Sequence, residues 1–268
     1  MNKFTLITGA SKGLGLEFSK RCAFLGRNIL MVSLPGEGLE KTSSEISQSY
    51  DVRCDFFECD LTDSVSVESL HKKVVSEGYK IDFLINNAGF GGTAPYETHP
   101  QEYIQSLLDL NVKATSLMIN KFLPLLKENK SSHILNIASV LAGVPSPYKA
   151  LYASSKTYIK SLSIALSYEL EESGVGVSVL MTGAAPTNEV VKDQIKNGTF
   201  AARITVMSPQ DIARVAIHKT LIGQRIITTS FRIKLILILI SILPNNVIAK
   251  IGINQFKKQL KVGVKSST

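Results

Sequence analysis

The chain has 268 residues, of which 44% are hydrophobic and 19% charged. This length suits one α/β domain with a large core and is short for two, and the composition excludes a disordered protein. The charge is uneven, because residues 1–211 carry 20 Lys/Arg against 22 Asp/Glu, whereas residues 212–268 carry 10 Lys/Arg and no acid. Basic tails of this kind often meet anionic surfaces.

The beginning of the chain and its cysteines indicate a cytoplasmic protein. The sequence opens on an apolar run without a basic region and cleavage site, so no secretory signal is expected. Cys22, Cys54 and Cys59 are odd in number and form no Cys-x-x-Cys pair, which predicts buried, reduced thiols. The four scattered histidines lack the spacing of metal ligands, so no metal site is predicted.

Short apolar runs alternate along the chain with longer segments of helical period. The runs predict strands at 4–8, 28–33, 52–59, 82–85, 132–138, 175–181 and 225–229. The segments between them predict helices at 13–25, 38–50, 63–77, 100–127, 150–173 and 208–222, with Asp63 and Ser208-Pro209 as starts. This alternation predicts an α/β fold: a doubly wound parallel sheet with helices on both faces and ligands beyond the carboxyl ends of its strands.

A glycine-rich loop follows the first predicted strand. Its residues are Thr8, Gly9, Ala10, Ser11, Lys12, Gly13, Leu14 and Gly15. Glycines here allow a tight turn and bring backbone N–H groups close to a pyrophosphate at a helix N-terminus. A glycine cluster alone could equally be an ordinary strand-to-helix turn.

The end of the second predicted strand bears on the choice between NAD and NADP. An NAD site usually places an acid there for the ribose 2′-hydroxyl, but this chain has Ser33 and Leu34. The missing acid permits a 2′-phosphate, and Lys12 can supply a positive charge near it, although Lys12 could also be solvated and no Arg follows the strand. We therefore expect NADP(H) to be favoured over NAD(H).

Tyr152 and Lys156 open a long predicted helix. Residues i and i+4 lie on one helix face, so both side chains can reach one site. A free tyrosine has a pKa of about 10, and a nearby cation lowers it toward the range of a proton shuttle. The pair is common by chance, and an amphipathic helix surface would explain it alone.

Two further polar residues occupy positions where this fold gathers its reacting groups. Ser139 follows the fifth predicted strand and can hydrogen-bond a substrate carbonyl beside Tyr152. Asn111 lies in an otherwise apolar helical segment. It either faces solvent or needs a partner, such as a water linked to Lys156.

In their order and spacing, these motifs resemble the short-chain dehydrogenase/reductase family over about residues 4–230, closest in character to 3-oxoacyl, 3-ketosteroid and 3-ketosphinganine-type reductases. The resemblance implies a Rossmann-fold domain over 1–230 and a Ser–Tyr–Lys–Asn tetrad formed by Ser139, Tyr152, Lys156 and Asn111. In the family the Tyr is the acid or base, the Lys lowers its pKa and binds the nicotinamide ribose, the Ser orients the carbonyl, and the Asn supports a proton relay.

The same resemblance implies further cofactor contacts. They involve Gly9, Ser11, Lys12, Gly13, Leu14, Gly15, Ser33, Asp60, Leu61, Asn87, Ala88, Gly89, Tyr152, Lys156, Gly183 and Thr187. The Asp60-Leu61 pair would meet the adenine, although Asp60 could instead cap the next helix. Thr182 replaces a family proline, which makes the contact of that loop with the nicotinamide less certain.

The substrate side of the predicted site is apolar. Its residues are Val140, Leu141, Ala142, Val144, Pro145 and Tyr148, and they could also be ordinary core. Residues 188–200 are expected to form either a mobile lid or a fixed surface helix. An apolar cleft suits a lipid-like ketone, so a 3-oxoacyl chain, 3-ketosphinganine or a steroid is the substrate hypothesis.

Residues 231–268 are expected to form a basic, apolar helical extension. The run from Leu235 to Leu243 is about half the ~20 residues needed to span a bilayer. It could pack against its own domain or a second subunit, or lie in a membrane interface with its Lys and Arg drawn to anionic lipid. No nucleic-acid motif is present.

The sequence thus predicts an NADP(H)-dependent oxidoreductase that acts on an apolar carbonyl or alcohol. Relatives are usually dimers or tetramers, and the location is expected to be cytoplasmic, with peripheral membrane contact left open. The alternatives are a non-catalytic NADP-sensing regulator and a membrane-associated interaction protein on the same fold.

Overall fold

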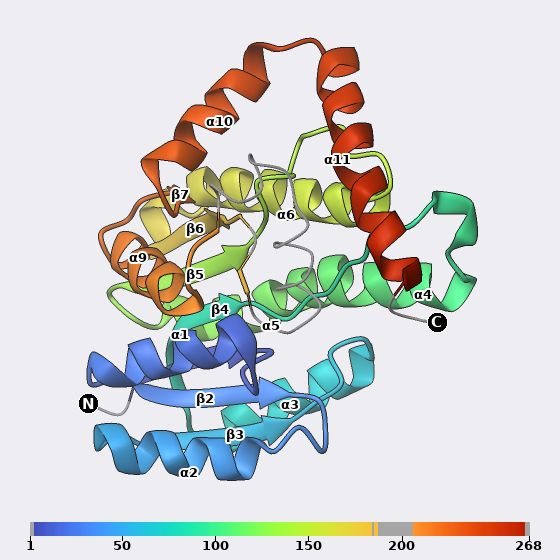
Figure 1. The fold of residues 1–268 in the computed structure, drawn as a ribbon. Coiled ribbons are helices and arrows are strands. Elements are labelled where there is room, and N and C mark those ends of the chain that lie inside the picture. Colours follow the sequence, from blue (N-terminus) through green and yellow to red (C-terminus); the bar gives the residue numbers. More distant parts are fainter. Residues whose placement is uncertain (1–2, 184, 187–205, 266–268) are drawn as a thin grey trace.

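A computed structural model of the chain describes residues 3–183, 185–186 and 206–265 (Figure 1). Seven parallel strands form one sheet in the order β3-β2-β1-β4-β5-β6-β7. They are β1 Lys3–Thr8, β2 Asn28–Ser33, β3 Cys54–Glu58, β4 Lys80–Asn86, β5 Ser132–Ile137, β6 Val175–Met181 and β7 Ile226–Thr228. The order reverses between β1 and β4, the switch point at which such sheets bind ligands.

Helices cover both faces of the sheet, which confirms the predicted doubly wound α/β fold. One face carries α1 Gly13–Phe24, α2 Leu39–Tyr50 and α9 Pro209–Leu221. The other carries α3 Ser64–Ser76, α4 Gln101–Leu108, α5 Thr115–Lys127 and α6 Ala150–Glu169. After β7, α10 Phe231–Ile242 rises away from the sheet, and α11 Asn245–Lys265 returns toward α6 (Figure 1).

The inner strands are largely apolar because their side chains contribute to both cores. In β2, Leu30 and Val32 belong to the core under α3 and α5, whereas Ile29 and Met31 belong to the core under α1 and α9. Successive side chains of a strand point to opposite faces, so a strand buried on both faces needs apolar residues at nearly every position. This is the pattern from which the parallel sheet was predicted.

Most predicted boundaries agree with the structure within a few residues, and both predicted helix starts are confirmed. Asp63 accepts hydrogen bonds from the backbone of Val65 and Ser66, and Ser208 accepts one from Asp211. The segment predicted as one helix over 100–127 is helical throughout but changes to a π-helical turn at Asp109–Ala114. Helical periodicity does not distinguish that local widening from a regular α-helix.

The three cysteines are buried and free, as predicted. Burial raises the pKa of Cys22 and Cys54 to about 12 and that of Cys59 to about 11. These thiols therefore remain protonated near neutral pH and act as small core residues.

Candidate active site

The glycine loop is fixed to the end of β4 at the sheet's switch point. Thr8 Oγ1 accepts hydrogen bonds from the backbone N–H groups of Asn87 and Ala88, both at 3.0 Å. The Asn87 side chain donates to the carbonyls of Thr8 at 2.9 Å and Gly9 at 3.2 Å. These contacts hold the loop across two neighbouring strand ends.

Two glycines of this loop are required by close backbone approach. A Cβ at Gly15 would lie 2.0 Å from the Gly9 carbonyl oxygen, and Gly9 itself has a φ of +62° with Ala88 Cα 3.0 Å from where its Cβ would be. Lys12, at the N-cap of α1, makes no side-chain capping bond, and no acid lies in the first turn. The loop thus leaves a helix N-terminus suited to an anion, which fits the pyrophosphate of a dinucleotide.

An acid lies close to the end of β2, and the sequence interpretation did not anticipate it. Glu37 folds back from the turn after β2, where its carboxylate accepts hydrogen bonds from Ser11 at 2.5 Å, from Lys12 at 2.6 Å and from Ser33. Partial burial alone would raise the pKa of Glu37, but the three donors outweigh it and lower the pKa to about 2. Three residues predicted to contact the cofactor therefore converge on one anionic group.

Tyr152 and Lys156 lie on the first two turns of α6, with the Lys156 ammonium 5.9 Å from the centre of the Tyr152 ring. Lys156 is buried and donates to the backbone carbonyl of Ile137, at the end of β5, at 2.9 Å. Ser139, two residues beyond that strand, is also buried and hydrogen-bonds Tyr152. The structure therefore brings the predicted Ser, Tyr and Lys together at one strand end.

The electrostatics of Tyr152 correct one expectation. Burial raises the pKa of Tyr152, and the hydrogen bond from Ser139 opposes this shift only in part. Lys156 was expected to lower it, but its ammonium is directed to a carbonyl, and burial lowers the pKa of Lys156 itself to about 8. In this arrangement desolvation dominates, so the phenol keeps its proton at neutral pH.

Asn111 lies in the π-helical turn and is buried, which excludes the solvent-facing alternative. Its side-chain oxygen accepts from the Phe90 N–H at 3.0 Å, and its amide nitrogen donates to the Phe90 carbonyl at 2.8 Å and to Ser155 Oγ at 3.1 Å. A Cβ at Gly89 would lie 2.9 Å from Asn111 Oδ1 and 3.3 Å from Lys156 Nζ. Only the absence of a side chain at Gly89 lets the amide and the ammonium approach the same place.

A second glycine shapes the site and was missed by the sequence interpretation. A Cβ at Gly91 would lie 2.2 Å from Cδ2 of Tyr152, so the tyrosine ring packs flat against backbone. The signal in the sequence was the pair Gly91-Gly92, which shortly follows Asn86-Asn87-Ala88-Gly89 at the end of β4.

The remaining predicted cofactor residues lie at the same edge of the sheet. Asp60 accepts from the backbone and hydroxyl of Thr62, at 2.9 and 2.7 Å, and Asp63 caps α3, so Asp60 is not the cap. Leu61 is buried, and Gly183 follows β6. Thr187 and the predicted lid over 188–200 lie outside the described residues.

Residues 3–197 match the family described as short chain dehydrogenase. The chain belongs to this family. A fatty acyl-CoA reductase of Acinetobacter baylyi is 28% identical over 95% of this chain and 85% of that relative. A very-long-chain 3-oxoacyl-CoA reductase of Coprinopsis cinerea is 30% identical over 67% of this chain, which spans 53% of that relative's length.

A solved 3-ketoacyl-(acyl-carrier-protein) reductase from Brucella melitensis, complexed with NADH, is 28% identical, with a TM-score of 0.72 over 84% of this chain and 96% of that one. The chain is accordingly an NAD(P)-dependent dehydrogenase/reductase.

The segment between Ser139 and Tyr152 of this dehydrogenase packs against α11. A Cβ at Gly252 would lie 3.2 Å from Cδ of Pro147, and the Phe256 ring lies 5.5 Å from Lys149 Nζ. Tyr148, within the same loop, has a φ of +65°, a conformation that bulky residues rarely adopt. The C-terminal extension therefore packs on the segment that joins Ser139 to Tyr152.

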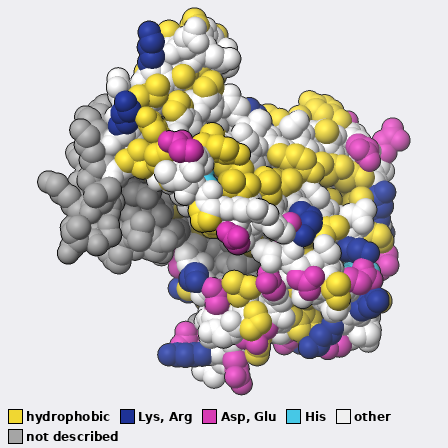
Figure 2. Space-filling model, turned by 90° about the vertical axis from the view of Figure 1, so that its right-hand side faces the viewer, with side chains coloured by type: hydrophobic (Ala, Val, Ile, Leu, Met, Phe, Trp, Pro, Cys, Tyr) yellow, Lys and Arg dark blue, Asp and Glu magenta, His cyan; other side chains and the backbone are white. Residues whose placement is uncertain are grey.

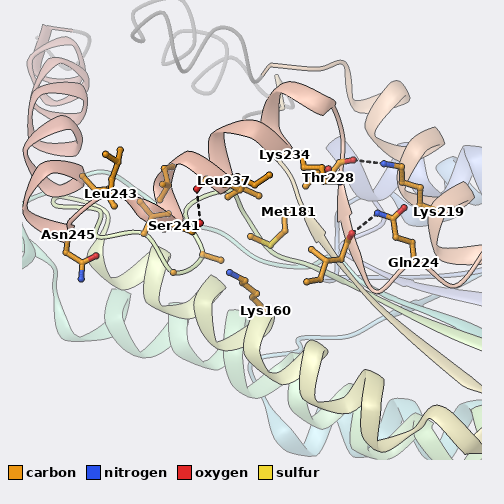
Figure 3. Close-up of a pocket in the computed structure, with 17 residues that line it drawn as sticks. Lys160, Met181, Lys219, Gln224, Thr228, Lys234, Leu237, Ser241, Leu243 and Asn245 are labelled. Atoms are coloured by element: carbon orange, nitrogen blue, oxygen red, sulfur yellow. Dashed lines mark hydrogen bonds between the residues drawn. The ribbon is translucent and has the colours of Figure 1, made fainter.

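A cavity of about 720 Å³ lies between α6, α10 and the strands β6 and β7 (Figure 3). Met181 and Leu237 lie on facing sides of it, and Lys160 points into it from α6 (Figure 3). Ala142 and Val144, expected in the substrate cleft, line this cavity. The four predicted tetrad residues are not among the side chains that line it.

Proposed function

We propose that this dehydrogenase interconverts a lipid-like ketone and its secondary alcohol with NADP(H), using Ser139, Tyr152, Lys156 and Asn111. The observation that carries the proposal is the contact of Ser139 with Tyr152 beside the buried Lys156 at the carboxyl end of β5. A proton donor and a carbonyl-orienting hydroxyl thereby face the same place.

Each residue has a distinct task in this proposal. Ser139 donates a hydrogen bond that holds the carbonyl oxygen beside the Tyr152 hydroxyl. Tyr152, whose pKa burial raises, keeps its proton at neutral pH and gives it to that oxygen during reduction. When bound, the nicotinamide supplies the hydride that the carbonyl carbon receives, so proton and hydride together yield the alcohol.

Lys156 and Asn111 support that proton transfer. Lys156 would hold the nicotinamide ribose, and its ammonium is positioned by the Ile137 carbonyl. Asn111 is held by Phe90 and Ser155 and lies across Gly89 from Lys156, which suits it to order a water between them. The complete tetrad also favours an enzyme over a non-catalytic NADP-sensing regulator.

Two features of the chain support a preference for NADP(H). The cradle formed by Gly9 and Gly15 fits a dinucleotide, because a side chain at either position would collide with backbone. Beyond it, Ser11, Lys12 and Ser33 direct two hydroxyls and an ammonium at one anionic group. Such a donor set suits a 2′-phosphate.

The apolar loop after Ser139 and the names of two relatives, a very-long-chain 3-oxoacyl-CoA reductase and a fatty acyl-CoA reductase, support a lipid-like ketone. The test is NADPH oxidation by the purified full chain against ketones of graded chain length. Turnover should rise with chain length. Good turnover of small polar ketones, with none of long-chain oxo lipids, would overturn the substrate proposal.

We further propose that residues 231–268 place the enzyme on an anionic membrane surface as a peripheral contact. Among the described residues, no helix is both long and apolar enough to cross a membrane. Yet α10 exposes Ile238, Leu239 and Ile242 by 51%, 56% and 73%, and no acid lies anywhere in 212–268. Figure 2 shows the side of the molecule on which α11 and α4 lie, where hydrophobic side chains form a broad band with Lys and Arg near its upper end and acids beside it.

Charge complementarity favours anionic lipid over a second copy of the chain, because two copies of a region with only positive charges repel each other. The assembly into dimers or tetramers usual among relatives would then use other surfaces. Vesicle binding, described in the Discussion, tests this part of the proposal.

A further inference from the structure

The turn after β2 holds a carboxylate where the proposed cofactor needs anion-binding groups. Oε2 of Glu37 accepts from Ser11 Oγ at 2.5 Å and from Ser33 Oγ, and Oε1 accepts from Lys12 Nζ at 2.6 Å. Ser11 and Lys12 come from the glycine loop, and Ser33 is the last residue of β2. Donors from two separate segments therefore meet on one side chain.

This donor set is better matched to a phosphate than to a structural ion pair. A carboxylate and a phosphate are both acceptor-only anions, and hydroxyls together with an ammonium satisfy either. The ammonium of Lys12 lies on a side chain that is 79% exposed, whereas the Glu37 side chain is 23% exposed. An ion pair at that exposure contributes little to the stability of the fold, so stability alone does not explain the arrangement.

The turn that carries Glu37 has open space on both sides of that residue. Gly36 and Gly38 flank the residue with φ values of +78° and +74°, and a Cβ at either would meet nothing within 4 Å. The backbone is anchored on either side of Glu37, because the Gly36 N–H donates to Glu58 at 2.9 Å and the Gly38 carbonyl accepts from the Thr42 N–H at 3.2 Å, so the Glu37 side chain itself is the part that can move. Glu37 can thus leave its three donors without disturbing a packed core.

We propose that Glu37 occupies the 2′-phosphate site of the cofactor and must be displaced before NADPH binds, so that this residue sets the discrimination between NADPH and NADH. The inference rests on the proposed function in taking Ser11, Lys12 and Ser33 as the 2′-phosphate donors. NADH brings a hydroxyl that Glu37 accepts without leaving, as acids after this strand do in NAD sites. NADPH brings a second anion, which competes with Glu37 for the same hydrogen bonds.

The experiment is calorimetric titration of the full chain and its variants with NADPH, NADH, adenosine 2′-phosphate and adenosine 5′-phosphate. In Glu37→Gln, the affinities for NADPH and adenosine 2′-phosphate should rise on the order of tenfold, because a competing charged acceptor is lost. The affinity for adenosine 5′-phosphate should stay unchanged, and that for NADH should stay unchanged or fall.

Glu40→Gln is the matched control, since this exposed acid in the first turn of α2 is outside the donor set. It removes the same charge three residues away and should leave all four affinities unchanged. Adding Lys12→Met to Glu37→Gln should abolish the gain for NADPH. An unchanged or weaker NADPH affinity in Glu37→Gln, or an equal gain in Glu40→Gln, would overturn the inference.

This inference and the cofactor preference can fail separately. Tighter binding of NADH than NADPH by the unaltered chain would refute the NADP(H) preference alone. The inference would still stand if Glu37→Gln shifted the ratio of affinities toward NADPH. If neither 2′-phosphate ligand responded to Lys12→Met, the assignment of the donor set itself would be wrong.

Discussion

The sheet with its strand-end site and the C-terminal pair of helices differ in how their side chains are satisfied. At the site, the buried Lys156 and Asn111 and the half-buried Asn87 each have partners within the chain. In α10, by contrast, apolar side chains face outward, and Ile233 is the buried residue of the helix. The first region is explained by its own contacts, whereas the second exposes apolar side chains, which fits the proposed membrane contact.

The largest effect on cofactor binding should come from filling the backbone contact at the glycine loop. Gly15→Ala would place a methyl group 2.0 Å from the Gly9 carbonyl, and backbone cannot yield as a side-chain end can. Cofactor affinity measured by calorimetry should fall by at least about 100-fold, since a displaced loop cannot present its N–H groups to the pyrophosphate.

Gly26→Ala provides the control for that change. Gly26 has a φ of +72° and open space around it, so alanine there costs about 1 kcal/mol of stability without touching the loop. Cofactor affinity should be kept. Equal losses in both variants would show that the close approach of Gly9 and Gly15 is not what forms the site.

The next effect concerns the amide that orders the tetrad. Asn111→Ala removes the partner of Phe90 and should lower kcat about 100-fold while KM changes little, because the proton relay and not substrate binding is lost. Asn129→Ala is the matched control, since that amide bonds Ile81 and Leu125 far from the site. Asn129→Ala should lower the melting temperature and retain kcat. If Asn129→Ala lowered kcat as much as Asn111→Ala does, the role of Asn111 would be structural only.

A smaller effect is expected on vesicle binding, which should depend on α10 and not on the strand-end site. Leu239→Glu combined with Ile242→Glu places two acids on the exposed side of α10 and should weaken co-sedimentation with vesicles containing anionic phosphatidylserine about tenfold or more. Turnover of a soluble ketone should not change. Phe24→Glu combined with Leu25→Glu, at the C-terminal end of α1, is the control, because it makes the same change in charge at exposed apolar residues outside α10.

Two outcomes would count against the membrane contact. Unaltered vesicle binding by the α10 variant would exclude the surface, and conversion of a dimer to a monomer by the same variant would assign it to a second copy of the chain. Either result would also remove the difference drawn between the two regions, because the exposed side of α10 would then not be a membrane-binding surface.

The smallest effect is in the pH dependence of stability. The pKa of Glu37 is lowered from 4.5 to about 2, so its contribution is full above 4.5 and is lost as the pH falls toward 2. Between these limits the melting temperature of the unaltered chain should fall slightly more than that of Glu37→Gln. Identical slopes, measured by circular dichroism, would show that the three hydrogen bonds do not hold Glu37 in solution.

Most of the fold and the tetrad could be predicted from the sequence because they depend on residue type at fixed spacing. Tyr152 and Lys156 share a helix face wherever a helix forms, and Ser139 follows a strand whose end lies at the ligand-binding edge. Nearly continuous apolar runs predicted strands that are buried on both faces of the sheet.

Other features depend on tertiary contacts that no local pattern reports. Glu37 lies four residues past the end of β2 and reaches Lys12 only through a turn between two glycines; the segment Gly36-Glu37-Gly38 was its one sequence signal. The raised pKa of Tyr152 follows from burial, which a motif does not reveal. Likewise, the contact of α11 with Pro147 joins residues about a hundred positions apart.

The most direct test of the account is the Tyr152→Phe variant, which keeps the ring against Gly91 and removes only the hydroxyl that Ser139 contacts. Calorimetry and steady-state turnover should be measured on the same preparation. The account predicts unchanged cofactor affinity and a fall in kcat of about 1,000-fold or more, because the proton donor is absent. Turnover close to that of the unaltered enzyme would contradict the assignment of Tyr152 as the proton-transferring residue.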